Sequence, residues 1–199
     1  PYSGTKTPKI QSRSVVRPPF QRVLIANRGE IACRIARSAR HMGLTTVAVY
    51  SDADRGAVHV SACDLAIPIG GHAPAESYLA IDKLLDAARQ SGAQAVHPGY
   101  GFLSERAEFA RAVLDAGLVF VGPPPAAIDA MGDKALARRA MAAAGVPVLP
   151  GYDLDDQSDA ALIVAARDIG FPVMVKAAAG GGGRGMRLVH RAADLPEAM

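Results

Sequence analysis

Tryptophan is absent from the 199-residue sequence, and cysteine occurs only twice, as Cys33 and Cys63. Two cysteines are too few for a disulfide framework or a zinc site, and because both stand in apolar surroundings we expect buried, reduced thiols. No apolar run approaches the roughly 20 residues that a membrane-spanning helix needs, so we expect no membrane partner. Half of the residues are nevertheless hydrophobic, which is enough for a folded core.

Acidic residues are missing from one end of the sequence. The formal charge is +3, but residues 1–22 hold five basic side chains and no acidic one, which leaves 17 basic and 19 acidic residues in the remainder. The body of the protein is therefore slightly acidic, which argues against nucleic acid as a partner. We interpret residues 1–20 as a leader or arm: the remnant of an organellar transit peptide, a solvated arm, or a remnant of cloning.

Short apolar runs alternate with helical patterns from Arg22 onward. The apolar runs cover 22–27, 45–50, 64–69, 93–98 and 118–125, and the helical patterns cover 30–43, a stretch that begins near Glu76, and 104–116. This alternation is typical of an α/β fold, in which a parallel sheet carries helices on both faces. The first turn, ANRGE, holds the single glycine Gly29 rather than G-x-G-x-x-G. We therefore expect a Rossmann-like domain over 21–130 that does not bind NAD.

The remaining residues, 131–199, follow a different pattern. Helices are expected over 133–145 and 158–169, β-type runs over 171–178 and 186–190, and the beginning of a further helix over 193–199. The two β-type runs flank Gly180–Gly185, which begins with four consecutive glycines. These glycines join two strands rather than a strand and a helix, which excludes a Walker-type phosphate loop.

Lys176 stands on the strand before the glycines, whereas in a protein kinase the lysine follows the glycine-rich loop. Glycine lets backbone N–H groups approach phosphate oxygens closely, and a lysine adds a compact positive charge. Alternation along the strand places Lys176 on the face opposite Val173 and Val175. We therefore predict a phosphate-binding hairpin flap; the alternative is a flexible linker beside a solvated lysine.

Four sequence blocks resemble the biotin carboxylase component of biotin-dependent carboxylases: ANRGEIACR (26–34), HPGYGFLSE (97–105), MGDK (131–134) and KAAAGGGGRGM (176–186). They occur in the order of that family, and the resemblance extends over about 20–199. It implies a ligase with a Rossmann-like, pre-ATP-grasp domain followed by the start of an ATP-grasp domain over 131–199. It also implies ATP, Mg²⁺ or Mn²⁺, bicarbonate as substrate, and biotin attached to a carrier domain outside this chain.

The resemblance also assigns ATP contacts residue by residue. Five residues match them, namely the phosphate lysines Lys134 and Lys176 and the flap residues Gly182, Gly183 and Met186. For Arg184 and Arg187 a phosphate contact and a solvated role both stay open. The family's catalytic and metal-binding residues lie beyond the position of Met199. We therefore expect no metal ligand in this chain, and no activity from the chain alone.

The block HPGYGFLSE has a structural interpretation, which is that it shapes the edge of the site. Gly99 and Gly101 suit a turn between a strand and a helix, and Ser104 suits the N-cap of that helix. His97 could be a ligand, but we expect a packed core histidine.

A narrower resemblance rests on 122–134 and 141–159, which look most like the alpha subunits of 3-methylcrotonyl-CoA carboxylases, enzymes of leucine degradation. This resemblance implies a carboxyltransferase beta subunit as partner in a hetero-oligomer, and a mitochondrial matrix location, with bacterial cytoplasm as the alternative. The equivalent parts of propionyl-CoA, acetyl-CoA and pyruvate carboxylases remain open. So does a non-catalytic nucleotide-binding or assembly module.

Overall fold

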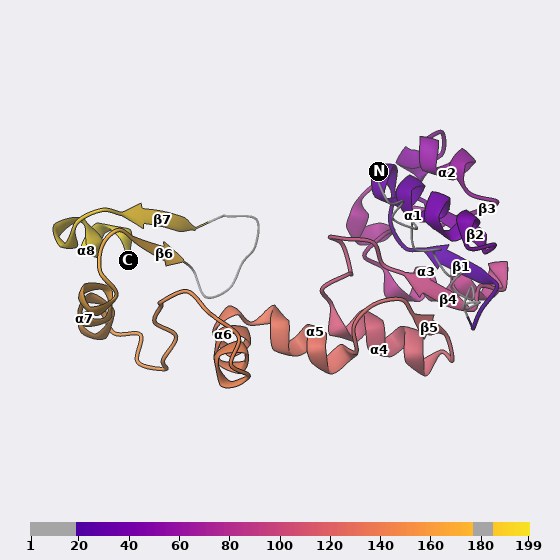
Figure 1. Cartoon of the computed structure of the whole chain (residues 1–199). Helices are drawn as coiled ribbons and strands as arrows, with labels where there is room; N and C mark the ends of the chain where they lie inside the picture. The colour runs from indigo at the N-terminus through magenta and orange to yellow at the C-terminus, as the bar shows by residue number, and fades with distance from the viewer. Residues whose placement is uncertain (1–18, 177–184) are drawn as a thin grey trace, which may run out of the picture. The chain divides into compact units, whose positions relative to one another are not determined.

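The computed structural model describes residues 19–176 and 185–199 of the chain. The chain divides into two compact units (Figure 1). The first unit comprises the residues up to Ser104 together with Ala112–Gly122, and the second comprises Glu105–Arg111 together with Pro123–Met199. In the described ranges, no helix is long and apolar enough to cross a membrane.

The first unit is built on a five-stranded sheet in the order β3-β2-β1-β4-β5, and every neighbouring pair is parallel. The strands are β1 (Arg22–Ile25), β2 (Thr45–Tyr50), β3 (Leu65–Pro68), β4 (Ala95–His97) and β5 (Val119–Phe120). The helices that alternate with them are α1 (Gly29–His41), α2 (Val58–Ala62), α3 (Ile81–Ser91) and α4 (Ala107–Asp115). The predicted α/β architecture with a parallel sheet is confirmed.

Aliphatic side chains form the core on both faces of this sheet. Ile25 packs with Ala32, Ile35 and Ala36 of α1, whereas its neighbour Leu24 points to the opposite face because side chains alternate along a strand. Both residues are fully buried. A strand buried on both faces reads as a continuous apolar run, which is why β1 and β2 could be recognised in the sequence.

The two cysteines differ in burial. Both are free thiols, but only Cys63 is buried, and burial raises the pKa of its thiol. Cys33 is only half-buried because it stands one position beside the buried stripe of α1 that includes Ala32 and Ala36. The prediction of buried thiols is therefore right for Cys63 and wrong for Cys33.

Two helices of the first unit begin later than expected. Pro74–Glu76 form a single 3-10 turn, and α3 begins only at Ile81, because the hydroxyl of the intervening Tyr78 is fixed to Ser51 and Asp54. The helix expected from Ser104 begins at Ala107. The Ser104 N–H closes a turn by donating to the carbonyl of Gly101, so the prediction that Ser104 is the N-cap is wrong.

The described residues of the second unit include the first part of α4, which the division between the units cuts after Arg111, and four further helices and one β-hairpin. The further elements are α5 (Pro125–Gly132), α6 (Lys134–Ala143), α7 (Asp159–Ile169), β6 (Val173–Lys176), β7 (Met186–Val189) and α8 (Leu195–Ala198). The sequence did not indicate α5. It begins on a proline, which is preorganised for a first helical position, and it is separated from α6 by the extended backbone of Asp133. The Asp133 carboxylate then accepts hydrogen bonds from the N–H groups of Ala135 and Leu136 and caps α6.

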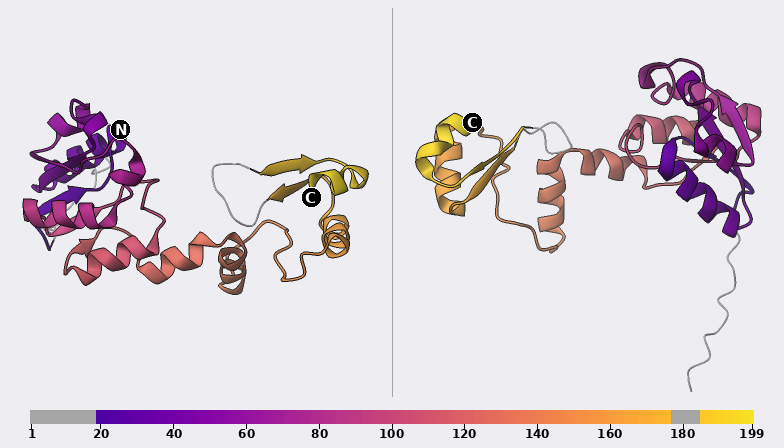
Figure 2. Two further views of the ribbon diagram at one scale, coloured as in Figure 1. Left: turned by 180° about the vertical axis from the view of Figure 1, so that it is seen from behind. Right: turned by 90° about the horizontal axis from the view of Figure 1, so that it is seen from above.

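A small core joins the hairpin to two helices of this unit. Ala166 of α7, Val189 of β7 and Leu195 of α8 are its buried members, and Val173 and Val175 pack against them. Helices α7 and α8 accordingly lie on one side of the hairpin, as Figure 2 shows. The other side of the hairpin is left for the candidate site.

Candidate nucleotide-binding site

The two strands of the hairpin are antiparallel, and their register decides which side chains share a face. Lys176 lies opposite Met186, and Met174 lies opposite Leu188. Residues that are directly opposite point to the same face, and so do residues two positions apart. These four side chains, which we call the lysine face, therefore lie together.

The two faces of the hairpin differ in burial. On one face, Val173 and Val175 are half-buried and Val189 is buried against α7 and α8. On the lysine face all four side chains are exposed. The prediction that Lys176 points away from Val173 and Val175 is confirmed. The lysine face combines one cation with three apolar side chains, an arrangement that suits a ligand with an anionic group and a flat apolar ring.

The glycines between the strands lie outside the described residues. This holds for Gly182 and Gly183 and also for Arg184. Gly185, the first residue described after them, has φ +70°, a left-handed conformation that favours glycine, and it leads directly into Met186. The hairpin itself is thus established by β6, β7 and their register.

Lys134 occupies the first position of α6, directly after the capping residue Asp133. It is exposed. Lys134 thus belongs to α6, whereas Lys176 and Met186 lie opposite each other on the hairpin.

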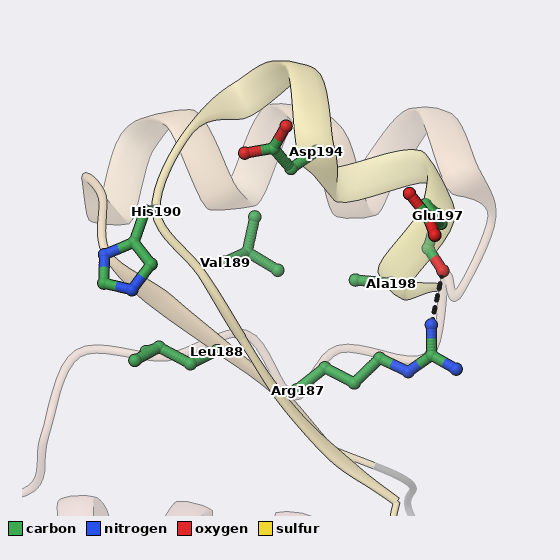
Figure 3. A pocket seen from close by; sticks show the side chains of 7 residues that line it. All are labelled: Arg187, Leu188, Val189, His190, Asp194, Glu197 and Ala198. Atoms are coloured by element: carbon green, nitrogen blue, oxygen red, sulfur yellow. Dashed lines mark hydrogen bonds between the residues drawn. The ribbon is translucent and has the colours of Figure 1, made fainter.

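Arg187 lies on the opposite face of the hairpin from Lys176, across from Val175. Its guanidinium Nη1 donates a hydrogen bond of 2.7 Å to the carbonyl of Glu197 in α8. Figure 3 shows this contact beside a hollow of about 380 Å³ that β7 and α8 line. Arg187 is exposed, so of the two roles left open for it the structure favours a solvated side chain, here held by one hydrogen bond, over a phosphate contact on the lysine face.

The HPGYGFLSE block forms a tightly held loop in the first unit. Gly99 and Gly101 both have positive φ angles, as a turn at these positions requires. The side-chain amide of Asn27 donates hydrogen bonds of 2.8 Å to the carbonyls of Pro98 and Tyr100. A β-carbon at position 99 would lie 2.6 Å from this amide nitrogen, so only glycine fits there.

His97 is half-buried at the start of this loop. Burial, with a smaller effect from Arg34, lowers the pKa of the imidazole and favours its neutral form. The ring nitrogen Nδ1 can then accept the hydrogen bond of 3.0 Å from the N–H of Gly99. His97 thus has a role within the loop, which agrees with the structural interpretation of the block.

Sequence analysis missed an aromatic and ionic cluster next to this loop. The ring of Phe102, whose backbone has φ +43°, stacks on Tyr78 with centroids 5.1 Å apart. The Arg28 guanidinium lies over both rings and pairs with Asp54 at 3.0 Å, and Asp54 also accepts a hydrogen bond of 2.7 Å from Tyr78. Neither the spacing nor the type of these residues links them in the sequence.

The Asp54 carboxyl is at the centre of this cluster. Burial by itself would raise its pKa, but hydrogen bonds from Tyr78, Arg28 and Ser51 outweigh burial and lower it. Burial also raises the pKa of Tyr78 to about 12. At neutral pH Asp54 is therefore a carboxylate and Tyr78 a neutral phenol. Their hydrogen bond holds the ring on which Phe102, in the loop that follows β4, is stacked.

Among the residues that the structure describes, no three histidine, cysteine, aspartate or glutamate side chains gather as metal ligands would. What the chain does present is a parallel α/β unit and a hairpin whose outer face suits a phosphate-bearing ligand. The chain belongs to the biotin carboxylase family: the family description "Biotin carboxylase, N-terminal domain" matches residues 19–128. A second description, "Carbamoyl-phosphate synthase L chain, ATP binding domain", matches residues 133–199.

Individual proteins agree with this family. The mitochondrial methylcrotonoyl-CoA carboxylase subunit alpha of Oryza sativa is 54% identical over 90% of this chain and 24% of its own length. The propionyl-CoA carboxylase alpha chain of Ruegeria pomeroyi is also 54% identical, over 85% of this chain and 25% of its own length. The crystal structure of a biotin carboxylase complex with β-γ-ATP from Campylobacter jejuni superposes with a TM-score of 0.84 at 45% identity, covering 90% of this chain and 40% of that one.

The chain thus spans about a quarter of the length of these two curated relatives. The likeness to the Campylobacter jejuni structure covers residues of both units, and that structure is of a nucleotide complex. The predicted start of an ATP-grasp domain after the Rossmann-like domain is therefore confirmed as a fold.

Proposed function

We propose that this chain is the part of a biotin carboxylase that holds the phosphates and the base of ATP. In the complete subunit, ATP and bicarbonate give carboxyphosphate, from which the carboxyl group passes to biotin on a carrier domain. The single observation that carries the proposal is the pairing of Lys176 with Met186 on the exposed face of the hairpin. A nucleotide needs both a cation for its phosphates and an apolar surface for its base.

Individual roles follow from position. Lys176 contacts phosphate oxygens, and the backbone N–H groups of Gly182 and Gly183 approach the same phosphates. The apolar side chains of Met174 and Met186 border the base, since both lie on the same face of the hairpin as Lys176. Lys134 supplies a second phosphate contact, since it matches a phosphate lysine of the family in the block MGDK.

Magnesium or manganese, when bound to ATP, neutralises phosphate charge. The described residues offer no cluster of carboxylates that fits such an ion, so we assign it no ligand among them. What the chain itself contributes is the binding and orientation of the nucleotide. We further propose the domain limits 21–130 and 131–199, with residues 1–20 as a leader that lies almost wholly outside the described residues.

Within the family, we propose the alpha subunit of a methylcrotonyl-CoA carboxylase, with a carboxyltransferase beta subunit as partner in a hetero-oligomer. The segment 141–159 supports this choice, whereas overall identity does not, because a propionyl-CoA relative is equally similar. By analogy with the rice relative we propose a mitochondrial location. A bacterial cytoplasmic location, by analogy with the Ruegeria relative, is the alternative.

The test uses the complete subunit with its biotin carrier. It should release phosphate from ATP in a reaction that requires both biotin and bicarbonate, and with its beta subunit it should carboxylate methylcrotonyl-CoA faster than propionyl-CoA or acetyl-CoA. Phosphate release without any dependence on biotin would refute the carboxylase assignment. A preference for another acyl-CoA would refute only the narrower one.

A further inference from the structure

A hollow of about 590 Å³ lies in the first unit, between the first half of α1 and the beginning of α2. We call it the α1 hollow, and it is lined by Gly29, Glu30, Cys33, Arg34, Arg37 and Val58. Sites for small molecules in proteins have volumes of about 300–1,000 Å³. The α1 hollow therefore has room for a small ligand, and its side chains indicate which kind.

The two arginines of the hollow differ from most others in having no carboxylate partner. Among the residues that the structure describes, nine arginines form ion pairs, and one of them is Arg40 of the same helix, which pairs with Asp64 at 3.0 Å. Arg34 and Arg37 are not among the nine, and both are exposed. Because they stand three positions apart on α1, their side chains share one face of the helix.

The acid that would neutralise Arg34 is engaged elsewhere. Glu30 stands four positions before Arg34, which is the spacing at which a glutamate and an arginine pair on a helix. Its carboxylate instead accepts a hydrogen bond of 2.6 Å from the hydroxyl of Tyr100. The charged side chains that line the α1 hollow thus combine two cations with one carboxylate that already has a partner, which leaves the hollow positively charged.

We propose that the α1 hollow binds a small phosphate-bearing anion through the guanidinium groups of Arg34 and Arg37. A planar guanidinium donates two parallel hydrogen bonds to phosphate oxygens, and these charge-assisted bonds are stronger than neutral ones. Two such groups on one helix face can contact the same dianion. The inference goes beyond the proposed function, because the hollow belongs to the first unit and its ligand needs neither ATP nor the lysine face.

Titration of the 199-residue chain with inorganic phosphate at constant ionic strength tests this inference. The backbone amide signals of residues 29–37 should shift in a saturable manner in NMR spectra. Arg34→Gln or Arg37→Gln should weaken the apparent affinity about tenfold, because each removes one charge-assisted contact. Arg167→Gln is the matched control, since Arg167 is an exposed arginine on α7, outside the hollow. Equal affinities in all three variants would overturn the proposal.

Two further controls separate this site from general attraction of anions and from the lysine face. Chloride at the same ionic strength should not shift the signals of residues 29–37, and equal shifts with chloride would mean that the hollow only gathers counter-ions, which would overturn the proposal. Lys176→Ala should leave the phosphate-induced shifts unchanged. The outcome therefore does not depend on whether the lysine face binds ATP.

His97 provides an independent measurement. Burial lowers the pKa of its imidazole, and the positive charge of Arg34 lowers it further. Because a bound anion offsets the charge of Arg34, saturating phosphate should raise the pKa of His97, which NMR titration of the imidazole measures. In Arg34→Gln the pKa should already be raised without phosphate, and phosphate should no longer change it. An unchanged pKa in the unsubstituted protein at saturating phosphate would overturn binding at Arg34.

A second copy of the chain is the other candidate occupant, and sedimentation velocity detects it. A dimer that Arg34→Gln or Arg37→Gln dissociates, without any loss of phosphate binding, would identify a second copy as the occupant and would overturn the proposal. Both arginines are exposed, so both variants should fold. If either fails to fold, the comparison of phosphate with chloride and the pKa of His97 in the unsubstituted protein decide the question.

Discussion

Lys176 lies directly opposite Met186 across the β6–β7 hairpin, and both side chains are exposed on the face that α7 and α8 leave open. One residue further along β7, Arg187 points to the other face and contacts α8. A single step along the strand thus separates a candidate ligand contact from a packing contact, since successive side chains alternate between faces. This difference allows a matched pair of substitutions.

Lys176→Ala in the complete subunit should weaken ATP binding about tenfold to a hundredfold, because a charge-assisted contact is worth roughly 1.5–3 kcal/mol. The fold should survive, since Lys176 is exposed. Arg187→Ala is the control on the same hairpin: it removes the contact to Glu197 and should lower the melting temperature without weakening ATP. Calorimetric titration with ATP measures both variants, and unchanged affinity in Lys176→Ala would mean that the lysine is merely solvated.

The double substitution Gly182→Val, Gly183→Val should strongly reduce ATP turnover of the complete subunit, because a β-carbon obstructs close approach of the backbone to phosphate. Without nucleotide the melting temperature should change little, since loops between strands lie at the surface. The increase in melting temperature that Mg-ATP confers should shrink, because that increase reflects binding to the folded state. Equal turnover and equal ATP-induced shifts would indicate a passive linker.

The isolated 199-residue chain should not hydrolyse ATP in a reaction that depends on biotin and bicarbonate. The described residues contain no cluster of potential metal ligands, and a carboxylation reaction needs charge stabilisation and a base in addition to nucleotide binding. A phosphate-release assay with and without free biotin measures this. Biotin-dependent release by this chain would contradict the proposed division of the active site.

The parallel sheet and the hairpin could be predicted because each depends on a local pattern. Strands such as β2 are buried on both faces and appear as continuous apolar runs, and the alternation along β6 already placed Lys176 opposite the valines. Boundaries that depend on distant contacts could not be predicted. The start of α3 is delayed by Tyr78, whose partners Ser51 and Asp54 lie more than twenty residues earlier in the sequence.

The candidate site, too, could be predicted only where it depends on a local pattern. The lysine and the glycines form a contiguous motif, so Lys176 and Met186 could be recognised from the sequence. Met174 lies on the same face by the same alternation along β6, but alternation does not distinguish a ligand contact from a solvent-exposed side chain, so its role could not be predicted. The positions of Arg28 and Phe102 around Tyr78 likewise depend on three segments that meet only in the folded unit.

Gly99 and Gly101 provide a matched test of the loop after β4. Both have left-handed φ angles, 69° and 65°, but a β-carbon at Gly101 meets nothing within 4 Å, whereas one at Gly99 would displace the Asn27 amide. Gly101→Ala should therefore cost about 1 kcal/mol of unfolding free energy from backbone strain. Gly99→Ala should cost about 3 kcal/mol or more, since it also disrupts the hydrogen bonds of Asn27. Urea denaturation measures both, and equal costs would contradict this account of the loop.

Asp54 should make the stability of the first unit sensitive to acid. Burial opposes ionisation of its carboxyl, but the hydrogen bonds from Tyr78, Arg28 and Ser51 prevail and lower its pKa in the folded protein. A group whose pKa is lower in the folded than in the unfolded state contributes stability above its unfolded pKa, and this contribution disappears as the pH falls through the folded pKa. The unfolding free energies of the unsubstituted protein and Asp54→Asn should therefore differ by a constant amount near neutral pH. The difference should shrink below about pH 4, the range of an ordinary aspartate.

Asp52→Asn is the control for this measurement, because it removes only the exposed ion pair with Arg55 at 3.2 Å. Exposed pairs of this kind contribute little to stability, about 0–1 kcal/mol. Urea denaturation of the three proteins at a series of pH values separates the two sites. A pH-independent difference between the unsubstituted protein and Asp54→Asn would mean that the Asp54 carboxylate owes its role to shape rather than to charge, and that Arg28 is held over the two rings mainly by packing.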